Sequence, residues 1–308
     1  MLGITEIGTY IPANRLSNLS RADKFGYDED FFINKLGVEK ISIKDETEDV
    51  AAMCLKAFDN LTKKVNWNSD ELDVIILVTQ NPDRKIPHTS AIIHGELGVK
   101  EDCACFDISL GCSGFVYGLS VIELFMEGNN LNKGLLFTCD PYSKIIDPDD
   151  KNTTILFGDA AAVTLITRSP KLSSGRFNFG TIGKEFGNLV CGNDENLFMN
   201  GRGIFNFAAR YIPGDLEVLL EKNKIAIDEI DRFVFHQGSK YIIDTLTRIM
   251  RLPGEKVIND ILFYGNTVSS SIPIILEKEL SNTENNIFYI CGFGVGLSWS
   301  STILKRVQ

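Results

Sequence analysis

The chain has 308 residues, of which 44% are hydrophobic and 23% are charged, and its net charge at neutral pH is −10. This composition excludes collagen-like, low-complexity and disordered chains. So acidic a protein is a poor match for the phosphates of nucleic acid, and an anionic partner would need a local basic patch. The seven cysteines are scattered and odd in number, which indicates reduced thiols and a cytoplasmic protein. Because no apolar run reaches the roughly 18–20 residues that span a bilayer, and the N-terminus does not resemble a signal peptide, no membrane partner is expected.

Short apolar segments alternate with segments at helical spacing. A continuous apolar and β-branched run such as DVIILVT is typical of a strand that is buried on both faces. Strands are predicted at residues 73–79, 105–110, 134–138 and 160–167, and helices at residues 90–97 and 113–126. This alternation predicts an α/β layered fold.

The order of segments recurs in the second half of the chain. ELDVIIL at 71–77 resembles EIDRFVF at 229–235, and KGLLFTC at 133–139 resembles NIFYIC at 286–291. Two matching halves of about 150 residues predict a duplicated fold, although buried strands can also resemble one another by chance. The segment 171–196, rich in Gly, Ser and Asn, is the predicted crossover. The predicted N-terminal half is then 1–170, with the candidate nucleophile, and the C-terminal half is 171–308.

Cys112 is the candidate nucleophile. It lies between Gly111 and Gly114, where a predicted strand gives way to a predicted helix, and these glycines allow a tight turn and close backbone approach. A cysteine at a helix N-terminus faces the positive end of the helix dipole, which favours the thiolate. Its own N–H can also face a developing oxyanion. The alternative is a small buried thiol that packs at the junction.

Two later motifs supply polar partners. His236 directly follows a predicted strand, at the carboxyl end where sites of α/β proteins form. Asn266 lies between a glycine and a polar run in YGNTVSSS at 264–271. A core histidine and a turn asparagine are the alternatives. The glycine-rich segment GFGVGLSW at 292–299 can approach a ligand closely through its backbone, or can form a hairpin.

Taken together, these motifs resemble the thiolase superfamily, and within it the β-ketoacyl-acyl-carrier-protein synthase III family. The matching segments follow one another along nearly the whole chain: GCSG at 111–114, LFGDAA at 156–161, HQ at 236–237, GNT at 265–267 and FGVGLSW at 293–299. The resemblance implies a duplicated, five-layer αβαβα fold and a homodimer. It also implies an acyltransferase of fatty acid or lipid metabolism that needs no metal or redox cofactor.

The resemblance further implies a mechanism. Cys112 would accept an acyl group from a thioester such as acyl-coenzyme A. A malonyl group on acyl carrier protein would then lose CO2, and its carbanion would attack the acyl-cysteine. His236 and Asn266 would donate hydrogen bonds to the malonyl thioester carbonyl as enolate charge develops. The backbone N–H groups of Cys112 and Val295 would form the oxyanion hole for acyl transfer.

Several positions depart from the usual residues of the family. The family's His-Gln-Ala-Asn is HQGS at 236–239, so Ser239 stands where an amide would support the histidine, and it offers fewer donors. At the expected donor entrance, Phe31 or Phe32, Lys35 and Lys151 stand for a Trp and two Arg. Since Lys cannot reproduce a stacked guanidinium, a donor bound to carrier protein becomes an alternative to acyl-coenzyme A.

A group of basic residues follows the His236 loop and is a candidate docking patch for an acidic carrier protein. Its members are Lys240, Arg248, Arg251 and Lys256. The alternative is a solvated helix face.

Three other functions remain open. A thiolase would use a second cysteine near the C-terminus, and Cys291 lies close to that position, although the family register falls nearer Phe293. Acyl transfer to oxygen or nitrogen without condensation is disfavoured by Asn266, because decarboxylation uses that amide. A non-catalytic synthase subunit is disfavoured by Cys112.

No metal site is predicted. Cys103 and Cys105 form a Cys-x-Cys pair without a second pair, and His88 and His94 have no cysteine or carboxylate cluster beside them.

Overall fold

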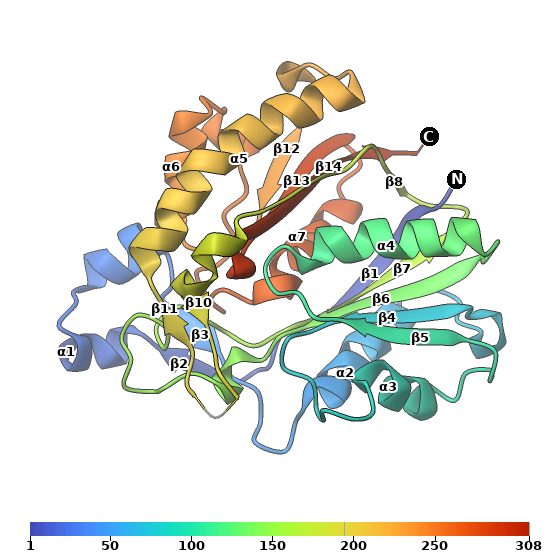
Figure 1. Ribbon diagram of the computed structural model, residues 1–308, viewed down its shortest axis with the longest axis horizontal. Helices are drawn as coiled ribbons and strands as arrows, with labels where there is room; N and C mark the ends of the chain where they lie inside the picture. Colours follow the sequence, from blue (N-terminus) through green and yellow to red (C-terminus); the bar gives the residue numbers. More distant parts are fainter. Residues whose placement is uncertain (194, 308) are drawn as a thin grey trace.

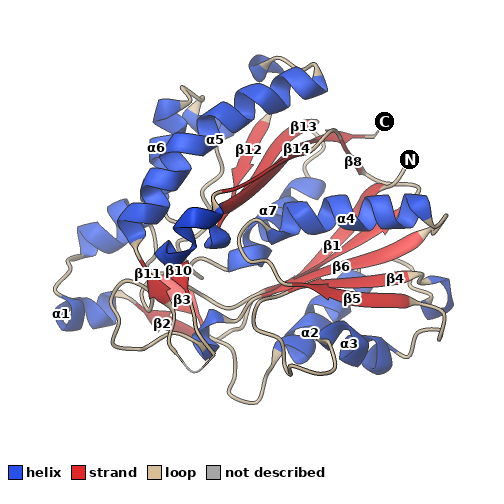
Figure 2. Cartoon of the chain, viewed as in Figure 1, coloured by secondary structure: helices blue, strands red, loops and turns tan. Residues whose placement is uncertain are grey.

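Residues 1–193 and 195–307 are described by the computed structural model, which shows five layers of helix and sheet (Figures 1 and 2). One sheet has the strand order β1-β7-β6-β4-β5, and in the other β12, β13, β14 and β9 lie side by side. The first sheet contains β1 (Gly3–Tyr10), β4 (Val74–Val78), β5 (Ala104–Ile108), β6 (Lys133–Cys139) and β7 (Ala161–Thr167). The second contains β9 (Asn178–Thr181), β12 (Arg232–Phe235), β13 (Ile287–Gly294) and β14 (Ser298–Arg306). The predicted α/β fold class is confirmed.

The middle layer consists of two helices packed between the sheets, as Figure 1 shows. These are α4 (Gly114–Gly128) and α7 (Ser271–Leu280). The outer layers are α2 (Val50–Thr62) with α3 (Thr89–Leu97) on one side and α5 (Gly201–Asn223) with α6 (Lys240–Ile249) on the other. The predicted strands and helices of the first half are confirmed with shifts of only a few residues at their ends. Within the described residues, no helix is both long and apolar enough to cross a bilayer.

Helix α4 is buried around most of its surface because sheets cover it on both sides. Its residues Phe115, Leu119 and Ile122 are completely buried and pack with Val78 of β4 and Ile290 of β13. Each such side chain contributes about 1.5–3 kcal/mol when it leaves water. This explains why 113–126 reads as a nearly continuous apolar run rather than as a one-sided amphipathic helix.

The same order of elements occurs twice. β4 pairs in parallel with β6, which is antiparallel to β7, and β12 pairs in parallel with β13, which is antiparallel to β14. Val257 forms a single parallel bridge with Phe233 of β12, in the place that β5 holds beside β4. The turn with Cys112 precedes α4, and the turn with Asn266 precedes α7. The two turns therefore occupy equivalent places in the repeat.

Short elements complete the chain. β8 (Leu172–Ser174) pairs with both β1 and β14 and so joins the two sheets directly after residue 170. Two small antiparallel strand pairs complete the structure: β2 (Arg15–Ser17) with β3 (Lys40–Ser42), and β10 (Leu189–Val190) with β11 (Phe198–Met199). Near the N-terminus lie α1 (Ala22–Phe25) and the turn of helix Phe31–Leu36, and the latter packs against α6.

Candidate active site

The turn that carries Cys112 is closed tightly on both sides. A Cβ on Gly111 would lie 2.5 Å from Gln80 Oε1 and 2.6 Å from Val295 Cγ1. A Cβ on Gly114 would lie 2.4 Å from a methyl carbon of Val78. Glycine is thus required at both positions for steric reasons, and the thiol is held at the entry to α4 with only 3% of the residue exposed.

The charge state of Cys112 is set by opposing effects. The pKa of the thiol is raised to about 12, chiefly by burial and to a smaller extent by the nearby Asp140 carboxylate, while the N–H groups of Val295 and of Cys112 itself oppose the shift. The expected stabilisation of the thiolate by the helix N-terminus is therefore opposed by a larger effect of burial. Removal of the sulfur from water outweighs the favourable dipoles.

The glycine-rich segment 292–299 approaches the nucleophile with its backbone. A Cβ on Gly292 would lie 2.6 Å from the carbonyl oxygen of Cys112, and one on Gly294 would lie 2.7 Å from Cys112 Sγ. The segment also connects the antiparallel strands β13 and β14, so the hairpin interpretation is confirmed, while approach to a ligand stays a prediction. Because the two backbones lie so close, the N–H groups of Val295 and Cys112 both point at the sulfur of Cys112.

His236 follows β12 and is 2% exposed. Its backbone N–H donates to the Cys291 carbonyl at 2.8 Å, its ring Nδ1 lies 2.8 Å from Ser271 Oγ, and its ring meets Phe293 edge-on. Burial lowers the pKa of the imidazole to about 3, and the Val268 carbonyl opposes this shift. The ring is accordingly neutral at physiological pH.

Asn266 is held by its own turn. Its Oδ1 accepts the Val268 N–H at 2.9 Å, which leaves Nδ2 as the donor that can face a substrate. Val268 adopts a left-handed conformation, with φ of 53°, which costs a β-branched residue about 1–2 kcal/mol. On the other side, the Asn266 backbone bonds the Leu156 carbonyl at 2.8 Å and the Gly158 N–H at 2.9 Å. The LFGDAA motif therefore supports the asparagine.

The three predicted catalytic residues line one cavity. It has a volume of ≈ 590 Å³ and contains Cys112, His236 and Asn266 among its lining residues. Its walls are largely apolar, with side chains such as Leu156 and Leu189. The three catalytic residues meet here because the turns before α4 and α7 and the ends of β12 and β13 converge.

The expected donor entrance is present only in part. Phe31 and Lys151 line the cavity, but Phe31 stacks face to face on Tyr27 at 3.9 Å between ring centroids, and Lys151 Nζ lies 5.6 Å from the Tyr27 ring. Phe32 is completely buried. Lys35 is not a lining residue and faces Asp30 at 3.6 Å.

Ser239 and the basic residues have partly different roles from those expected. Ser239 lines the cavity, but its Oγ caps α6 by accepting the Ile242 N–H at 3.3 Å. Lys240 forms an ion pair with Asp244. Lys256 donates to backbone carbonyls, including that of Ile230 at 2.6 Å. Of the four basic residues, Arg248 and Arg251 are exposed, and no described acidic side chain pairs with either.

Sequence reasoning missed several residues around the site. Ser271 contacts His236, Arg202 lines the cavity, and buried Asp140 accepts the Gln80 N–H at 2.7 Å and the Ser269 hydroxyl at 2.6 Å. The sequence features that could have pointed to Ser271 and Asp140 are a run of three serines and an aspartate that directly follows a strand. Neither pattern says which partner a polar side chain will meet.

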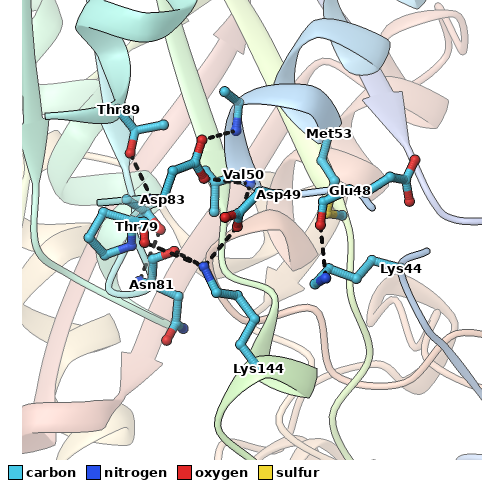
Figure 3. A network of polar contacts seen from close by, with 12 residues as sticks. Lys44, Glu48, Asp49, Val50, Met53, Thr79, Asn81, Asp83, Thr89 and Lys144 are labelled. Carbon is cyan, nitrogen blue, oxygen red and sulfur yellow. Dashed lines mark hydrogen bonds and ion pairs between the residues drawn. The ribbon is translucent and has the colours of Figure 1, made fainter. Parts of the chain in front are cut away.

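A polar network fixes the loop that contains Thr79, Asn81 and Asp83 (Figure 3). Gln80 of the same loop lies close to Gly111 in the nucleophile turn. Asp83 accepts the N–H groups of Val50 at 2.7 Å and Ala51 at 3.1 Å, at the start of α2. Lys144 bonds both the Asp49 carboxylate at 2.7 Å and the Asn81 carbonyl at 3.3 Å. The loop is therefore pinned from two neighbouring elements.

Among the residues that the structure describes, neither a second cysteine nor a metal-binding cluster lies at the site. Cys291 is completely buried in β13 opposite Ser301 and does not line the cavity, so it does not offer the acid–base thiol that a thiolase needs. His88 lies 3.6 Å from Cys105, and His94 bonds the Lys100 carbonyl. Over residues 1–193 and 195–307, no three His, Cys, Asp or Glu side chains gather as metal ligands would.

Known proteins with the same geometry identify the family. Residues 106–183 match the family described as 3-oxoacyl-[acyl-carrier-protein (ACP)] synthase III, and residues 220–306 match the family described as its C-terminal part. The beta-ketoacyl-[acyl-carrier-protein] synthase III of Lactococcus lactis is 30% identical, over 98% of this chain and 98% of its own. A Bacillus cereus protein, beta-ketoacyl-[acyl-carrier-protein] synthase III 1, is 30% identical over 99% of this chain and 98% of its own.

Solved structures agree with the sequence comparisons. The crystal structure of 3-oxoacyl-[acyl-carrier-protein] synthase III from Aquifex aeolicus superposes with a TM-score of 0.93, at 28% identity, over 99% of this chain and 100% of that one. The likeness covers both halves of the repeat, and the predicted five-layer thiolase-like fold is confirmed. The chain belongs to the β-ketoacyl-acyl-carrier-protein synthase III family of the thiolase superfamily, which consists of acyltransferase-type condensing enzymes.

Proposed function

We propose that this protein loads an acyl group from a thioester onto Cys112 and condenses it with malonyl-acyl-carrier protein. The observation that carries the proposal is the single cavity that joins Cys112, two N–H groups aimed at its sulfur, His236 and Asn266. The first half-reaction is a thioester exchange, and the second is driven by loss of CO2. Neither involves a net oxidation or reduction, so no metal or redox cofactor is needed.

In the acylation half-reaction, Cys112 Sγ attacks the thioester carbonyl, a new C–S bond forms, and the donor's C–S bond breaks. The thiol proton passes to the donor sulfur as it leaves. The carbonyl oxygen becomes an oxyanion close to the sulfur, where the N–H groups of Cys112 and Val295 can donate to it. A preorganised donor of this kind typically raises the reaction rate by about 10²–10³-fold.

In the condensation half-reaction, the malonyl C–CO2⁻ bond breaks and negative charge moves to the thioester oxygen. Asn266 Nδ2 can donate to that oxygen because Oδ1 is already occupied by the Val268 N–H. The enolate carbon then attacks the acyl-cysteine carbonyl, and Cys112 leaves as thiolate. Fixed dipoles act strongly here because the apolar cavity excludes water.

The donor and the malonyl group would both arrive on a carrier protein. Tyr27 covers a face of Phe31, so the ring is less open to stack on an adenine than a free aromatic side chain would be. The exposed Arg248 and Arg251 lie at the C-terminal end of α6. The N-terminal end of this helix, which Ser239 caps, lies at the cavity. Two exposed cations at the end of α6 that is farther from the cavity suit the surface of an acidic carrier protein.

The enzyme would act as a cytoplasmic homodimer. All seven cysteines are free thiols, as in a reducing compartment. Strand β5 pairs with β4 on one side only within the described residues, and a second copy could continue the sheet across this edge. Light scattering should then give about twice the 34.3 kDa chain mass, and a monomer at working concentration would contradict the dimer.

Intact-protein mass spectrometry with a panel of acyl thioesters tests the reaction. The unmodified protein should gain one acyl group, and Cys112→Ala should gain none. Asn266→Ala should still acylate, but should release CO2 from malonyl-carrier protein about 10²–10³ more slowly. An acyl adduct on Cys112→Ala would contradict the assignment of Cys112 as the nucleophile. Equal losses in both half-reactions of Asn266→Ala would instead favour a role in positioning the whole site.

A further inference from the structure

Three consecutive buried serines at the start of α7 each reach a different element. Ser269 Oγ donates to Asp140 at 2.6 Å, and Ser270 Oγ donates to the Thr138 carbonyl at 3.0 Å. Ser271 Oγ lies 2.8 Å from His236 Nδ1. The first two hold the sheet that carries the end of β6, whereas the third alone meets a catalytic side chain.

The hydrogen bonds of Ser271 indicate the direction in which its hydroxyl proton points. The hydroxyl donates to the Val268 carbonyl at 3.1 Å, and its oxygen receives the Gln237 N–H at 3.4 Å. A serine has one proton to donate and two lone pairs to accept. With the proton committed to Val268, the remaining contact is satisfied when His236 Nδ1–H donates to Ser271 Oγ. The Val268 carbonyl, which can only accept, also faces the ring.

We infer that Ser271 is a positioning residue that keeps the imidazole proton of His236 on Nδ1 and leaves the lone pair of Nε2 available at the active site. The inference rests on the proposed function for its consequence in the reaction, but the tautomer itself can be observed without turnover. It goes beyond the roles assigned to Cys112, His236 and Asn266, because it names the group that sets how His236 can act.

The consequence concerns the timing of proton transfer. During acylation, the Nε2 lone pair can accept the thiol proton of Cys112 and return it to the leaving donor sulfur. During condensation, Nε2 can donate to the enolate oxygen only after it has gained a proton from solvent. The carboxylate of the malonyl group favours this uptake, since an opposite charge nearby stabilises an imidazolium. When Cys112 leaves as thiolate, it takes that proton and the resting state returns.

Other titratable groups surround the histidine. Cys112 faces it from the turn before α4, and Cys291 accepts its backbone N–H on β13. Asp140, whose pKa burial raises to about 6, contacts Ser269 rather than Ser271. A pH profile of decarboxylation must therefore be compared with that of Asp140→Asn, which removes a buried carboxyl group near the site whose pKa lies close to neutrality.

Nitrogen NMR of the protein labelled with ¹⁵N-histidine tests the tautomer directly. The chain has three histidines, so a His236→Gln spectrum identifies the signals of interest. In the unmodified protein Nδ1 should carry the proton and Nε2 should not. In Ser271→Ala the fraction of the Nδ1-protonated tautomer should fall, although the Val268 carbonyl still faces the ring. A proton on Nε2 in the unmodified protein, or an unchanged tautomer in Ser271→Ala, would overturn the inference.

Kinetics of the two half-reactions supply a second readout. In the unmodified protein, the rate of malonyl decarboxylation should fall as pH rises above the pKa of His236 in the complex. In Ser271→Ala, this decline should be shallower. The rate at low pH should also be about fivefold to tenfold lower, because one hydrogen bond is lost. Ser270→Ala is the matched control: it removes a buried hydroxyl from the neighbouring position and should keep the steep profile. Identical profiles for Ser270→Ala and Ser271→Ala would contradict the inference. No decarboxylation by the unmodified protein would refute the proposed function and leave the NMR result standing.

Discussion

At the scale of single residues, Cys112 is subject to two opposing influences. The helix that follows it and the N–H groups of Cys112 and Val295 favour a thiolate, while complete burial of the sulfur disfavours it. Desolvation of a buried charge can shift a pKa by several units, whereas a helix terminus contributes on the order of 1 kcal/mol. The thiol therefore needs its proton removed during the reaction, and a neutral His236 is suited to take it.

The rate of alkylation of Cys112 should reveal which influence dominates. With a thiol pKa raised to about 12, the thiolate fraction at neutral pH is small and rises about tenfold per pH unit. Modification by iodoacetamide, followed by mass spectrometry, should accelerate steadily from pH 7 to pH 10 without a plateau. A plateau that begins below pH 9 would show that the helix terminus and the N–H groups outweigh burial. Cys112→Ala provides the background from the other thiols.

At the scale of elements, the end of β13 is shaped to lie against the turn before α4. Gly292 and Gly294 allow the two backbones to approach, and Val295 then directs its N–H at the sulfur. Asn266 depends in a similar way on the turn before α7, where Val268 adopts an unfavourable left-handed conformation. Both devices use backbone geometry, rather than additional side chains, to place the donors.

A methyl group at position 294 should block the nucleophile. In Gly294→Ala the new Cβ would lie 2.7 Å from Cys112 Sγ, which is closer than nonbonded atoms tolerate, so the acyl group has no room to form. We expect acyl-enzyme formation to fall by about 10²-fold or more, since a misplacement of about 1 Å is enough for that loss. Gly95→Ala in α3, where nothing lies within 4 Å of the added Cβ, should acylate normally. Normal acylation of Gly294→Ala would show that β13 can move away.

At the scale of the whole molecule, a net charge of −10 disfavours contact with an acidic carrier protein, so docking depends on a local patch. Two of the four predicted residues are already engaged: Lys240 pairs with Asp244, and Lys256 bonds backbone carbonyls. Arg248 and Arg251 remain as the exposed cations of this region. The patch is therefore smaller than the sequence suggests.

Charge reversal at Arg248 and Arg251 should raise KM for malonyl-carrier protein and leave acylation by a small thioester nearly unchanged. The difference should shrink with salt, because the Debye length falls from about 10 Å at 0.1 M to about 3 Å at 1 M. Arg176→Glu with Lys305→Glu makes an equal change of charge on the loop after β8 and the end of β14, away from α6 (Figure 1). If both double variants change KM equally, overall charge rather than docking at α6 is responsible.

The sequence by itself determined the fold class, the strands and helices of the first half, and the family. These features depend on patterns that are local or that recur in order: apolar runs report burial, and GCSG, HQ and GNT keep their places along the chain. Cys112 could be named because it lies between two glycines after a predicted strand, His236 because it directly follows a predicted strand, and Asn266 because it lies between a glycine and a polar run. Backbone donors such as Val295 were accessible only through the family resemblance.

Tertiary structure alone decided the charge of Cys112, the use of each basic residue and the role of Ser271. The pKa of a thiol depends on how much water the whole fold removes, which no local pattern reports. Lys35 and Lys256 read as free cations in the sequence, but Lys35 faces Asp30 outside the cavity and Lys256 donates to a neighbouring backbone. Ser271 meets His236 across 35 residues because α7 begins beside the end of β12, and such a contact is set by the packing of layers rather than by sequence spacing.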